Sequence, residues 1–551
     1  MALTLTRKQG VLPLHNKDNF DLSKYHERFE QERSQRTLQL RRISIGHQIF
    51  LLPRQTRRWT CSTNSNSLQT LATPENVFIA LQSVLNSTSS GQEILSLEKL
   101  EMTDFNFTIN EVNENHFNIQ NSSFESKVAF LQSLSELAQA YLHHISEHEE
   151  ICELLCDFLS NCIYDDNISS NSAGPRTQML FLVDLALNIT SLFFAAASEK
   201  IKTMYADNLA FSLNGLIETF SMNQKITFSI IQLIQTFAEN STYARNSITC
   251  VGVHSTLLEI AKTSTDPDLT EICLYAILAI YTSSWEHANF EEIDATVIED
   301  TICPLFEILT SKNDITINVH NICIIIQIFT ALTVARPSII DVLYSKGICQ
   351  LAAEFLSNPS LCKAAIHLLA RTVISNSSIE NGFLSPNLLS TMMQLLNNPD
   401  VIPDVYYFFS MVIESVPNIV KNFFSLDFIK ATLEMCQNAP LEVKKESIYF
   451  VATYVIFASS EELHQLLNDE MISLFDEMLC SGVDSIALRT VDALLNIILK
   501  LSQEQNFQEI ISHFAEYEIY DHLLNLVEHD HDILSKHAAS LSFKIESLMG
   551  Q

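Results

Sequence analysis

Four residues of metal-ligand type lie at helical spacing in the first third of the chain. His144, His148, Cys152 and Cys156 follow one another at intervals of four, which places them on one face of a helix, and imidazole and thiolate are ligands that Zn²⁺ accepts. Twelve residues of helix extend about 18 Å, so these side chains cannot all reach one ion. We predict no metal site and no other cofactor, and interpret the row as part surface and part core.

The sequence lacks the short motifs of the common enzyme classes. Only 10 of its 551 residues are glycine, and neither phosphate-binding loop, GxxxxGK[ST] or GxGxxG, occurs. GxSxG and HExxH are also missing, and no pair of carboxylates stands apart from the acidic helix faces. We therefore predict that the protein is not an enzyme.

Basic residues near the N-terminus could act in protein binding instead. A helix is predicted from about residue 22 to residue 40, after which Gly46 and Pro53 end helical structure. A guanidinium forms paired hydrogen bonds with carboxylates and stacks on aromatic rings, which suits an acidic partner surface. The predicted binding residues are Lys24, Arg28, Arg33, Arg36, Arg41 and Arg42, followed by a second group, Arg54, Arg57 and Arg58, on an extended tail.

The charges of the chain are divided unevenly. The first 58 residues hold 12 Lys and Arg against 5 Asp and Glu, whereas the remaining 493 hold 21 against 60. A basic arm on an acidic body either folds back onto that body or binds an acidic partner elsewhere, although a solvated tail is the simpler alternative. The total charge of −32 argues against nucleic-acid binding by the body, because phosphate contacts need Lys and Arg.

The composition also indicates the compartment. No signal peptide is visible at the N-terminus, and we see no apolar stretch of the 18 or more residues that a membrane-spanning helix needs. The 12 cysteines are scattered without CxxC pairs, as expected of reduced, buried thiols. We expect a soluble intracellular protein without membrane insertion.

A repeat of about 40 residues runs through the second half. The strings LAAEFLSNP, TMMQLLNNP and ATLEMCQNAP place Asn358, Asn398 and Asn438 at intervals of 40 in equivalent turns. Apolar residues within each unit recur at helical spacing, which predicts amphipathic helices that must bury a face against neighbouring units. This period favours armadillo over HEAT repeats. We predict an all-α, right-handed armadillo-repeat solenoid with a flexible basic N-terminal arm.

Breaks in the pattern suggest the domain division. The predicted parts are the basic arm over 1–60, a degenerate first repeat with an inserted loop over 61–124, and the solenoid over 125–551, with nine or ten repeats. A second break is expected at 169–178, where the sequence reads SSNSAGPRTQ.

The arm and the repeats together resemble the importin-α family of nuclear import adaptors. In the arm, Leu40-Arg41-Arg42 and Gln48-Ile49-Phe50 are similar to that family's importin-β-binding segment, with the last basic cluster displaced toward Arg57 and Arg58. Near the C-terminus, the string beginning at Lys444, KKESIYFVAT, resembles a late armadillo repeat. The resemblance covers nearly the whole chain, most strongly after about residue 224.

The resemblance implies a cargo groove, in which tryptophans hold lysine stems and asparagines bond the peptide backbone. Aromatic faces do attract cations, and side-chain amides do satisfy extended backbone. The chain has only two tryptophans, so most of the family's row of tryptophans is missing. Its tryptophan and asparagine positions fall on Gln232, Thr236, Tyr275, Tyr407, Tyr449 and Thr453, and its two carboxylate positions fall on Asn240 and Glu446. The tyrosines either stack on cationic stems or belong to the core.

Three hypotheses follow. The resemblance implies an adaptor that shuttles between cytoplasm and nucleus. Such an adaptor binds an importin-β-type carrier and basic nuclear-localisation-signal cargo, with a recycling exportin and nucleoporins as further partners. When no carrier is bound, the autoinhibitory residues Arg54, Arg57 and Arg58 of the arm are expected to compete with cargo for the groove. The loss of these tryptophans favours a second hypothesis, an armadillo scaffold that no longer carries such cargo. The third is a helical-repeat regulatory subunit of an enzyme, whose N-terminal arm would not bind a carrier.

Overall fold

The computed structural model describes residues 149–163, 173–239, 241–282, 295–310, 318–373, 384–416, 423–502 and 516–549, with Phe514 and scattered positions between 124 and 135. The predicted arm, the predicted inserted loop, His144 and His148 lie outside the described residues. Every regular element within the described ranges is a helix. The described helices fall into two compact units, one reaching Phe423 and including 439–450, the other comprising 424–438 and the residues from Val451 onward.

The first unit holds described α-helices of six to 24 residues. Their bounds are α5 Glu149–Cys162, α7 Ala173–Ala196, α8 Glu199–Phe220, α9 Gln224–Ala238, α10 Thr242–Val251, α11 Val253–Thr263, α12 Pro267–Thr282, α13 Ala295–Thr310, α14 Val319–Ala335, α15 Ile340–Ser345, α16 Ile348–Phe355, α17 Pro359–Thr372, α19 Pro386–Leu395 and α20 Ile402–Ser415, with the short 3₁₀ helix η4 Pro337–Ile339 before α15.

The second unit has the same kind of element. Its helices are α22 Leu426–Cys436, α24 Ser460–Leu466, α25 Asp469–Leu479, α26 Asp484–Leu501, α28 Ile519–Val527 and α29 Asp532–Met549. The division between the units falls within α23, Leu441–Phe457.

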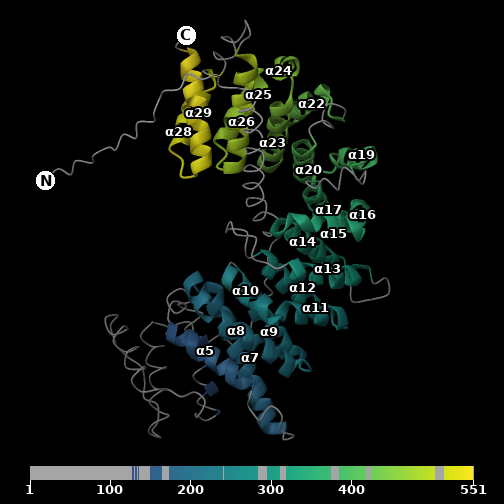
Figure 1. Ribbon diagram of the computed structural model, residues 1–551, viewed down its shortest axis with the longest axis vertical. Coiled ribbons are helices and arrows are strands. Elements are labelled where there is room, and N and C mark those ends of the chain that lie inside the picture. Colours follow the sequence, from purple (N-terminus) through teal and green to yellow (C-terminus); the bar gives the residue numbers. More distant parts are fainter. Residues whose placement is uncertain are drawn as a thin grey trace, which may run out of the picture. The chain divides into compact units, whose positions relative to one another are not determined.

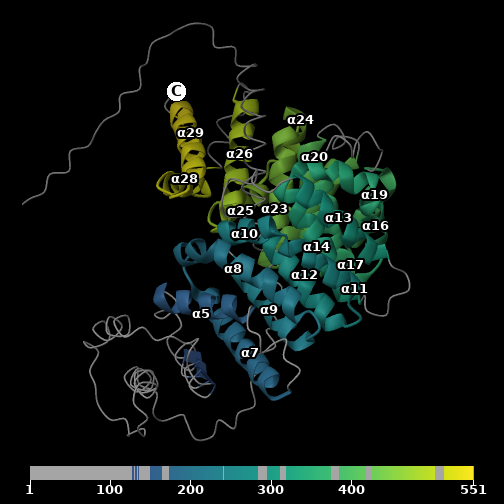
Figure 2. The same cartoon turned by 60° about the horizontal axis from the view of Figure 1, so that its bottom comes forward.

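Two rows of helices build each unit. In the first, α7, α9, α12, α14, α17 and α20 each pack against the next, and α8, α11 and α13 form a neighbouring row (Figure 1 and Figure 2). In the second, α26 packs against α29, and α22, α25 and α28 form the other row. We call α7, α9, α12, α14, α17, α20, α23, α26 and α29 the ladder helices. The prediction of an all-α array of armadillo-type repeats is confirmed.

Apolar side chains between successive repeats form the core. Phe194 of α7 and Phe237 of α9 meet edge to face with ring centroids 5.0 Å apart, and Tyr406 of α20 packs against Phe450 of α23 at 5.4 Å. All four side chains are buried. Because each helix pair buries its apolar stripe only against the next pair, stability in such an array is largely a sum of nearest-neighbour interfaces.

The repeated asparagines occupy the turns that the sequence predicted. The Asn358 side chain accepts a hydrogen bond from the backbone N–H of Ser360 at 3.0 Å and caps α17. Asn398 makes the equivalent bond to Asp400 before α20, and Asn438 lies in the turn before α23. At Asn358 the side-chain oxygen satisfies an N–H that the first helical turn leaves unpaired, and at Asn398 it satisfies one in the turn before α20, which explains why asparagine suits the start of these ladder helices.

Glycine in the left-handed conformation forms two of the turns between short helices. Gly252, with φ of 87°, joins α10 to α11, and Gly347, with φ of 76°, joins α15 to α16. A left-handed residue lets the chain turn sharply without a gap in helical structure, and a side chain raises its energy. Both repeats therefore have the short first helix, second helix and ladder helix of the armadillo pattern.

Two sequence expectations need correction. Helix α7 begins at Ala173, so much of the break predicted at 169–178 is helical. Its segment Arg176–Ala196, 21 residues with a mean hydropathy of 1.9, also has the length and apolar composition of a membrane-spanning helix, contrary to the expectation that no stretch does. Half of its most apolar window is buried inside the protein, and α7 packs against α5 and α9. A helix that is apolar on most sides is typical of a repeat core.

The cysteines are mostly core residues, as predicted. Among those described, Cys152, Cys156 and Cys273 are buried, and burial raises the pKa of the Cys156 thiol, with Cys152 beside it adding to the effect. Such thiols are poor nucleophiles because the thiolate is disfavoured. Cys250, Cys303 and Cys480 are exposed, so the expectation of burial is wrong for these three.

We predict that Gly252→Ala destabilises the protein by about 1 kcal/mol or more, because an alanine is strained in the left-handed conformation of this residue. No steric clash contributes, since no atom lies within 4 Å of the added Cβ. Denaturant unfolding followed by circular dichroism measures this change. Gly252→Asn is the matched control and should lose less, since asparagine tolerates this conformation. Equal stability of the alanine variant and the wild type would contradict the left-handed conformation of Gly252.

Candidate functional site

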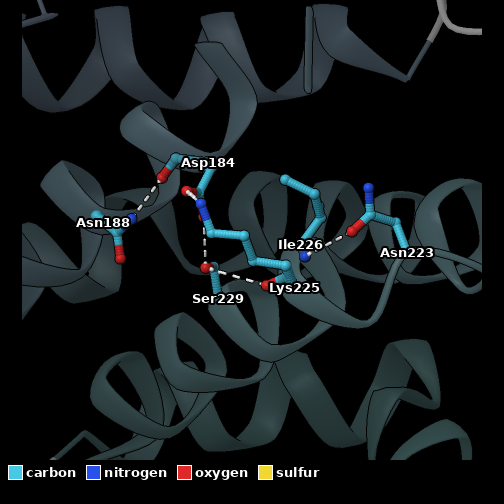
Figure 3. A network of polar contacts seen from close by, with 6 residues as sticks. All are labelled: Asp184, Asn188, Asn223, Lys225, Ile226 and Ser229. Carbon is cyan, nitrogen blue, oxygen red and sulfur yellow. Dashed lines mark hydrogen bonds and ion pairs between the residues drawn. The ribbon is translucent and has the colours of Figure 1, made fainter. Parts of the chain in front are cut away.

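Polar side chains of successive ladder helices bond to one another across the repeats. Between α7 and α9, the Ser229 hydroxyl donates to Asp184 Oδ1 at 2.8 Å, and Lys225 Nζ lies 2.6 Å from Asp184 Oδ2 (Figure 3). Asn188, one turn along α7, donates its amide to the Asp184 carbonyl at 2.8 Å. One carboxylate of α7 thus receives both a hydroxyl and an ammonium from the next repeat.

The start of α9 fixes the angle at which these donors meet Asp184. Asn223 caps the helix by accepting from the Ile226 N–H at 3.3 Å, and Ser229 also bonds the Lys225 carbonyl at 3.3 Å (Figure 3). One turn separates Lys225 from Ser229, so both project toward α7. The Lys225 side chain is 78% exposed and that of Asp184 only 14%.

A second contact lies further along the same pair of helices. The hydroxyls of Ser191 and Thr236 are 3.1 Å apart, and Thr236 also donates to the Gln232 carbonyl at 2.9 Å. Gln232 is exposed and Thr236 is half-buried. Both predicted groove positions on α9 therefore lie at its contact with α7, the preceding ladder helix. Asn240 lies outside the described residues.

Between α12 and α14, a tyrosine and a histidine form the contact. The Tyr275 hydroxyl is 2.8 Å from His320 Nε2, with ring centroids 5.9 Å apart. His320 Nε2 is also 3.6 Å from Glu271. Burial raises the pKa of Tyr275, and the neighbouring Glu271 carboxylate raises it further. Tyr275 stays protonated at neutral pH and is held by the next repeat.

Between α17 and α20, basic side chains of α17 contact an aspartate and a tyrosine of α20. His367 Nε2 lies 2.7 Å from Asp404 Oδ1, and Lys363 Nζ lies 3.6 Å from the same oxygen. The ring of Tyr407 is 5.4 Å from the His367 ring, and the guanidinium of Arg371 lies 6.0 Å from its centroid. Tyr407 is 2% exposed. Its ring is packed against the chain's own basic residues, which sequence reasoning missed.

The predicted positions on α23 differ in exposure. The Tyr449 hydroxyl donates to Glu414 of α20 at 3.1 Å, and Tyr449 and Thr453 are buried. Glu446, one turn earlier, is half-buried. The two tyrosine rings predicted as cation platforms are therefore interior residues, and Glu446 is the more accessible of the predicted groups on this helix.

In the second unit, side chains of α26 cap the end of α23. Asn496 donates to the Val455 carbonyl at 2.9 Å, and Lys500 Nζ donates to the carbonyls of Ile456 and Ala458 at 3.1 and 2.6 Å. The last carbonyls of a helix have no partners inside it and carry partial negative charge, so an ammonium from the next repeat stabilises them. At the end of α9, Lys202 of the preceding helix α8 donates to the Glu239 carbonyl at 2.7 Å.

The predicted residues are thus partly brought together. Those described all lie on ladder helices, Gln232 and Thr236 on α9, Tyr275 on α12, Tyr407 on α20, and Glu446, Tyr449 and Thr453 on α23. The arm residues Lys24, Arg28, Arg33, Arg36, Arg41, Arg42, Arg54, Arg57 and Arg58 lie outside the described residues. Among the described residues, no group of three or more His, Cys, Asp or Glu is arranged to hold a metal ion.

The comparisons with known proteins give no family. No protein-family model matches the chain, and neither does any curated protein. Among solved structures it is similar to an engineered protein, at 14% identity and a TM-score of 0.48, over 78% of this chain and 97% of the other. It is also similar to a designed armadillo repeat protein, at 15% identity and a TM-score of 0.35, over 44% and 98%.

We predict unequal contributions from the two bonds to Asp184. Ser229→Ala should lower the free energy of unfolding by about 1 kcal/mol, because it removes a hydrogen bond from a side chain that is shielded from water. Lys225→Ala should change it by no more than about 0.5 kcal/mol, because exposed ion pairs contribute little. Urea unfolding of the two variants measures both changes. A larger loss for Lys225→Ala than for Ser229→Ala would contradict this ranking.

Proposed function

We propose that the protein is a non-enzymatic, importin-α-like import adaptor, which binds basic protein segments along its ladder helices and an importin-β-type carrier through its N-terminal arm. The row of polar side chains on the ladder helices is the observation that carries the proposal. An extended peptide needs partners for its backbone and its charges along its whole length. Hydroxyls, amides and carboxylates that recur once per repeat match that need.

Charge supports a basic ligand. Acidic residues outnumber Lys and Arg by 60 to 21 beyond residue 58, so a lysine-rich segment is attracted before it makes any contact. Glu446 and the carboxylates of Asp184 and Glu271 lie on ladder helices. The basic residues of the arm suit an acidic carrier surface, because guanidinium groups bond carboxylates in pairs.

The burial of two tyrosines favours a second candidate, a scaffold that does not take classical basic signals. Tyr407 and Tyr449 are engaged by Arg371 and Glu414 of the chain itself. A scaffold of this kind retains the repeats and binds other protein surfaces. Binding of a basic peptide separates the two functions.

We predict that replacing Arg28, Arg33, Arg36, Arg41 and Arg42 by glutamate in the full chain lowers affinity for an importin-β-type carrier by at least about tenfold, since several charge-assisted bonds are lost. The matched control replaces Arg54, Arg57 and Arg58 by alanine and should leave carrier affinity nearly unchanged. Calorimetric titration with purified carrier measures both. Unaltered affinity of the first variant would refute carrier binding by this segment.

We also predict that deleting residues 1–58 strengthens binding of a lysine-rich import-signal peptide. A tethered competitor acts at an effective concentration of the order of millimolar, so its removal raises apparent affinity without a new contact. Fluorescence anisotropy with a labelled peptide measures the change, with a glutamate-substituted peptide as control. Equal affinity of the full and shortened chains would disprove self-inhibition, and binding by neither would favour the scaffold.

A further inference from the structure

Three histidines of the last described repeat face three aspartates of the repeat before it. His522 Nδ1 of α28 lies 2.7 Å from Asp476 Oδ1 of α25. His537 Nδ1 of α29 lies 2.9 Å from Asp492 Oδ1 of α26. In the turn between α28 and α29, His529 Nε2 lies 3.6 Å from Asp484 Oδ1 at the start of α26. All six residues belong to the second unit.

The stacking of the repeats creates this arrangement. The two closer pairs are separated by 46 and 45 residues, about one repeat length, because α28 packs on α25 and α29 packs on α26. Both helices of the last repeat are therefore attached at a histidine, and so is the turn that joins them. We call these three contacts the histidine clasp.

The pairs differ in their access to water. Asp492 is fully buried and the His537 side chain is 16% exposed, whereas His529 and Asp484 are 38% and 41% exposed. A buried carboxylate is costly unless it is paired and hydrogen-bonded. The pair of His537 and Asp492 should therefore contribute most to the clasp, and the exposed pair least.

We propose that the histidine clasp is a pH-dependent fastener, which holds α28 and α29 on the array more firmly when its imidazoles are protonated and releases them as the pH rises. A neutral imidazole gives its ionised aspartate a hydrogen bond in which only the acceptor is charged. An imidazolium gives the same hydrogen bond and adds the attraction between opposite charges, so the pair is stronger when the histidine is protonated. Imidazole is the side chain that ordinarily changes charge between pH 5 and 8, so this is the range over which the clasp is to be tested.

The acceptor sets the lower limit of this range. Burial raises the pKa of Asp476, the hydrogen bond from His522 counteracts that rise, and the nearby Glu518 carboxylate adds to it. The ionic pair needs an ionised aspartate and a protonated histidine together, so the clasp weakens again in strong acid. It is strongest in mildly acidic solution.

Other charged groups of these elements surround the clasp without replacing it. Lys536 of α29 pairs with Asp532 at 3.4 Å, Lys500 of α26 caps α23, and the hydroxyl of Tyr520 on α28 bonds Glu546 of α29. Lysine, arginine and the exposed carboxylates do not titrate between pH 6 and 8. The remaining charged or titratable residues of the packed elements are Asp469, Glu470, Glu477, Cys480, Arg489, Glu516, Tyr517, Asp521, Glu528, Asp530, His531 and Lys544.

Peptide-resolved hydrogen exchange on the full chain at pH 6.0 and 8.0, corrected for the intrinsic pH dependence of amide exchange, tests the proposal. We expect protection of residues 519–549 to fall by about tenfold from pH 6.0 to 8.0, because the opening of these helices is then no longer opposed by the ionic contacts. Residues 224–238 of α9, which contain no histidine, serve as the internal reference and should change little.

Substitution of the histidines identifies the groups responsible. The triple variant H522Q/H529Q/H537Q keeps a neutral donor at each position and should lose the pH dependence, while H464Q, at an exposed histidine of α24 outside the clasp, should retain it. If the triple variant does not fold, Asp492→Asn serves instead and should reduce the dependence most among single changes. Equal protection of wild-type residues 519–549 at both pH values, or an unchanged pH dependence in the folded clasp variants, would overturn the proposal.

Discussion

The structure depends on one constraint: a single helical repeat cannot bury its apolar stripe alone and must pack against the next. Burial of Phe194 against Phe237 and of Tyr406 against Phe450 satisfies that need repeat by repeat. The same stacking brings polar side chains that are 35 to 45 residues apart in the chain within bonding distance on adjacent ladder helices, as between Asp184 and Ser229 or Tyr449 and Glu414. Stability and the candidate binding surface thus arise from the same interfaces.

This double role explains why the candidate groove is less open than its sequence pattern suggested. Tyr275, Tyr407 and Tyr449 occupy ladder helices, and each contacts a side chain of an adjacent repeat. A side chain that holds two repeats together is released to a ligand only at a cost in stability. Exposed positions such as Gln232, and half-buried ones such as Glu446, are the less costly points of contact for a peptide.

Much of the fold follows from the sequence, because helical periodicity and capping are local. The turns at Asn358, Asn398 and Asn438 were located from their spacing alone, and each precedes a ladder helix. The start of α7 was misplaced because residues typical of breaks, Gly174 and Pro175, are tolerated in a first helical turn. Its apolar composition was missed for a related reason, since Asp184 interrupts it and is held by Lys225 and Ser229 of the next repeat.

The partners of the ladder residues could not be predicted in the same way. Packing of Arg371 over Tyr407, or pairing of His537 with Asp492, depends on which helix faces meet, and sequence spacing is only a weak signal for it. The interpretation of the tyrosines as cation platforms or core residues was left open, and the cations that the chain itself supplies, such as Arg371, were not predicted.

The claim that the ladder helices form the binding surface is tested most directly by mapping where a lysine-rich peptide protects the full chain from hydrogen exchange. The account predicts that added peptide slows exchange in α9, α12 and α23. Exchange in α8, α11 and α13, the neighbouring row of the first unit, should stay unchanged. Protection confined to α8, α11 and α13, or no protection at saturating peptide, would contradict binding on the ladder helices.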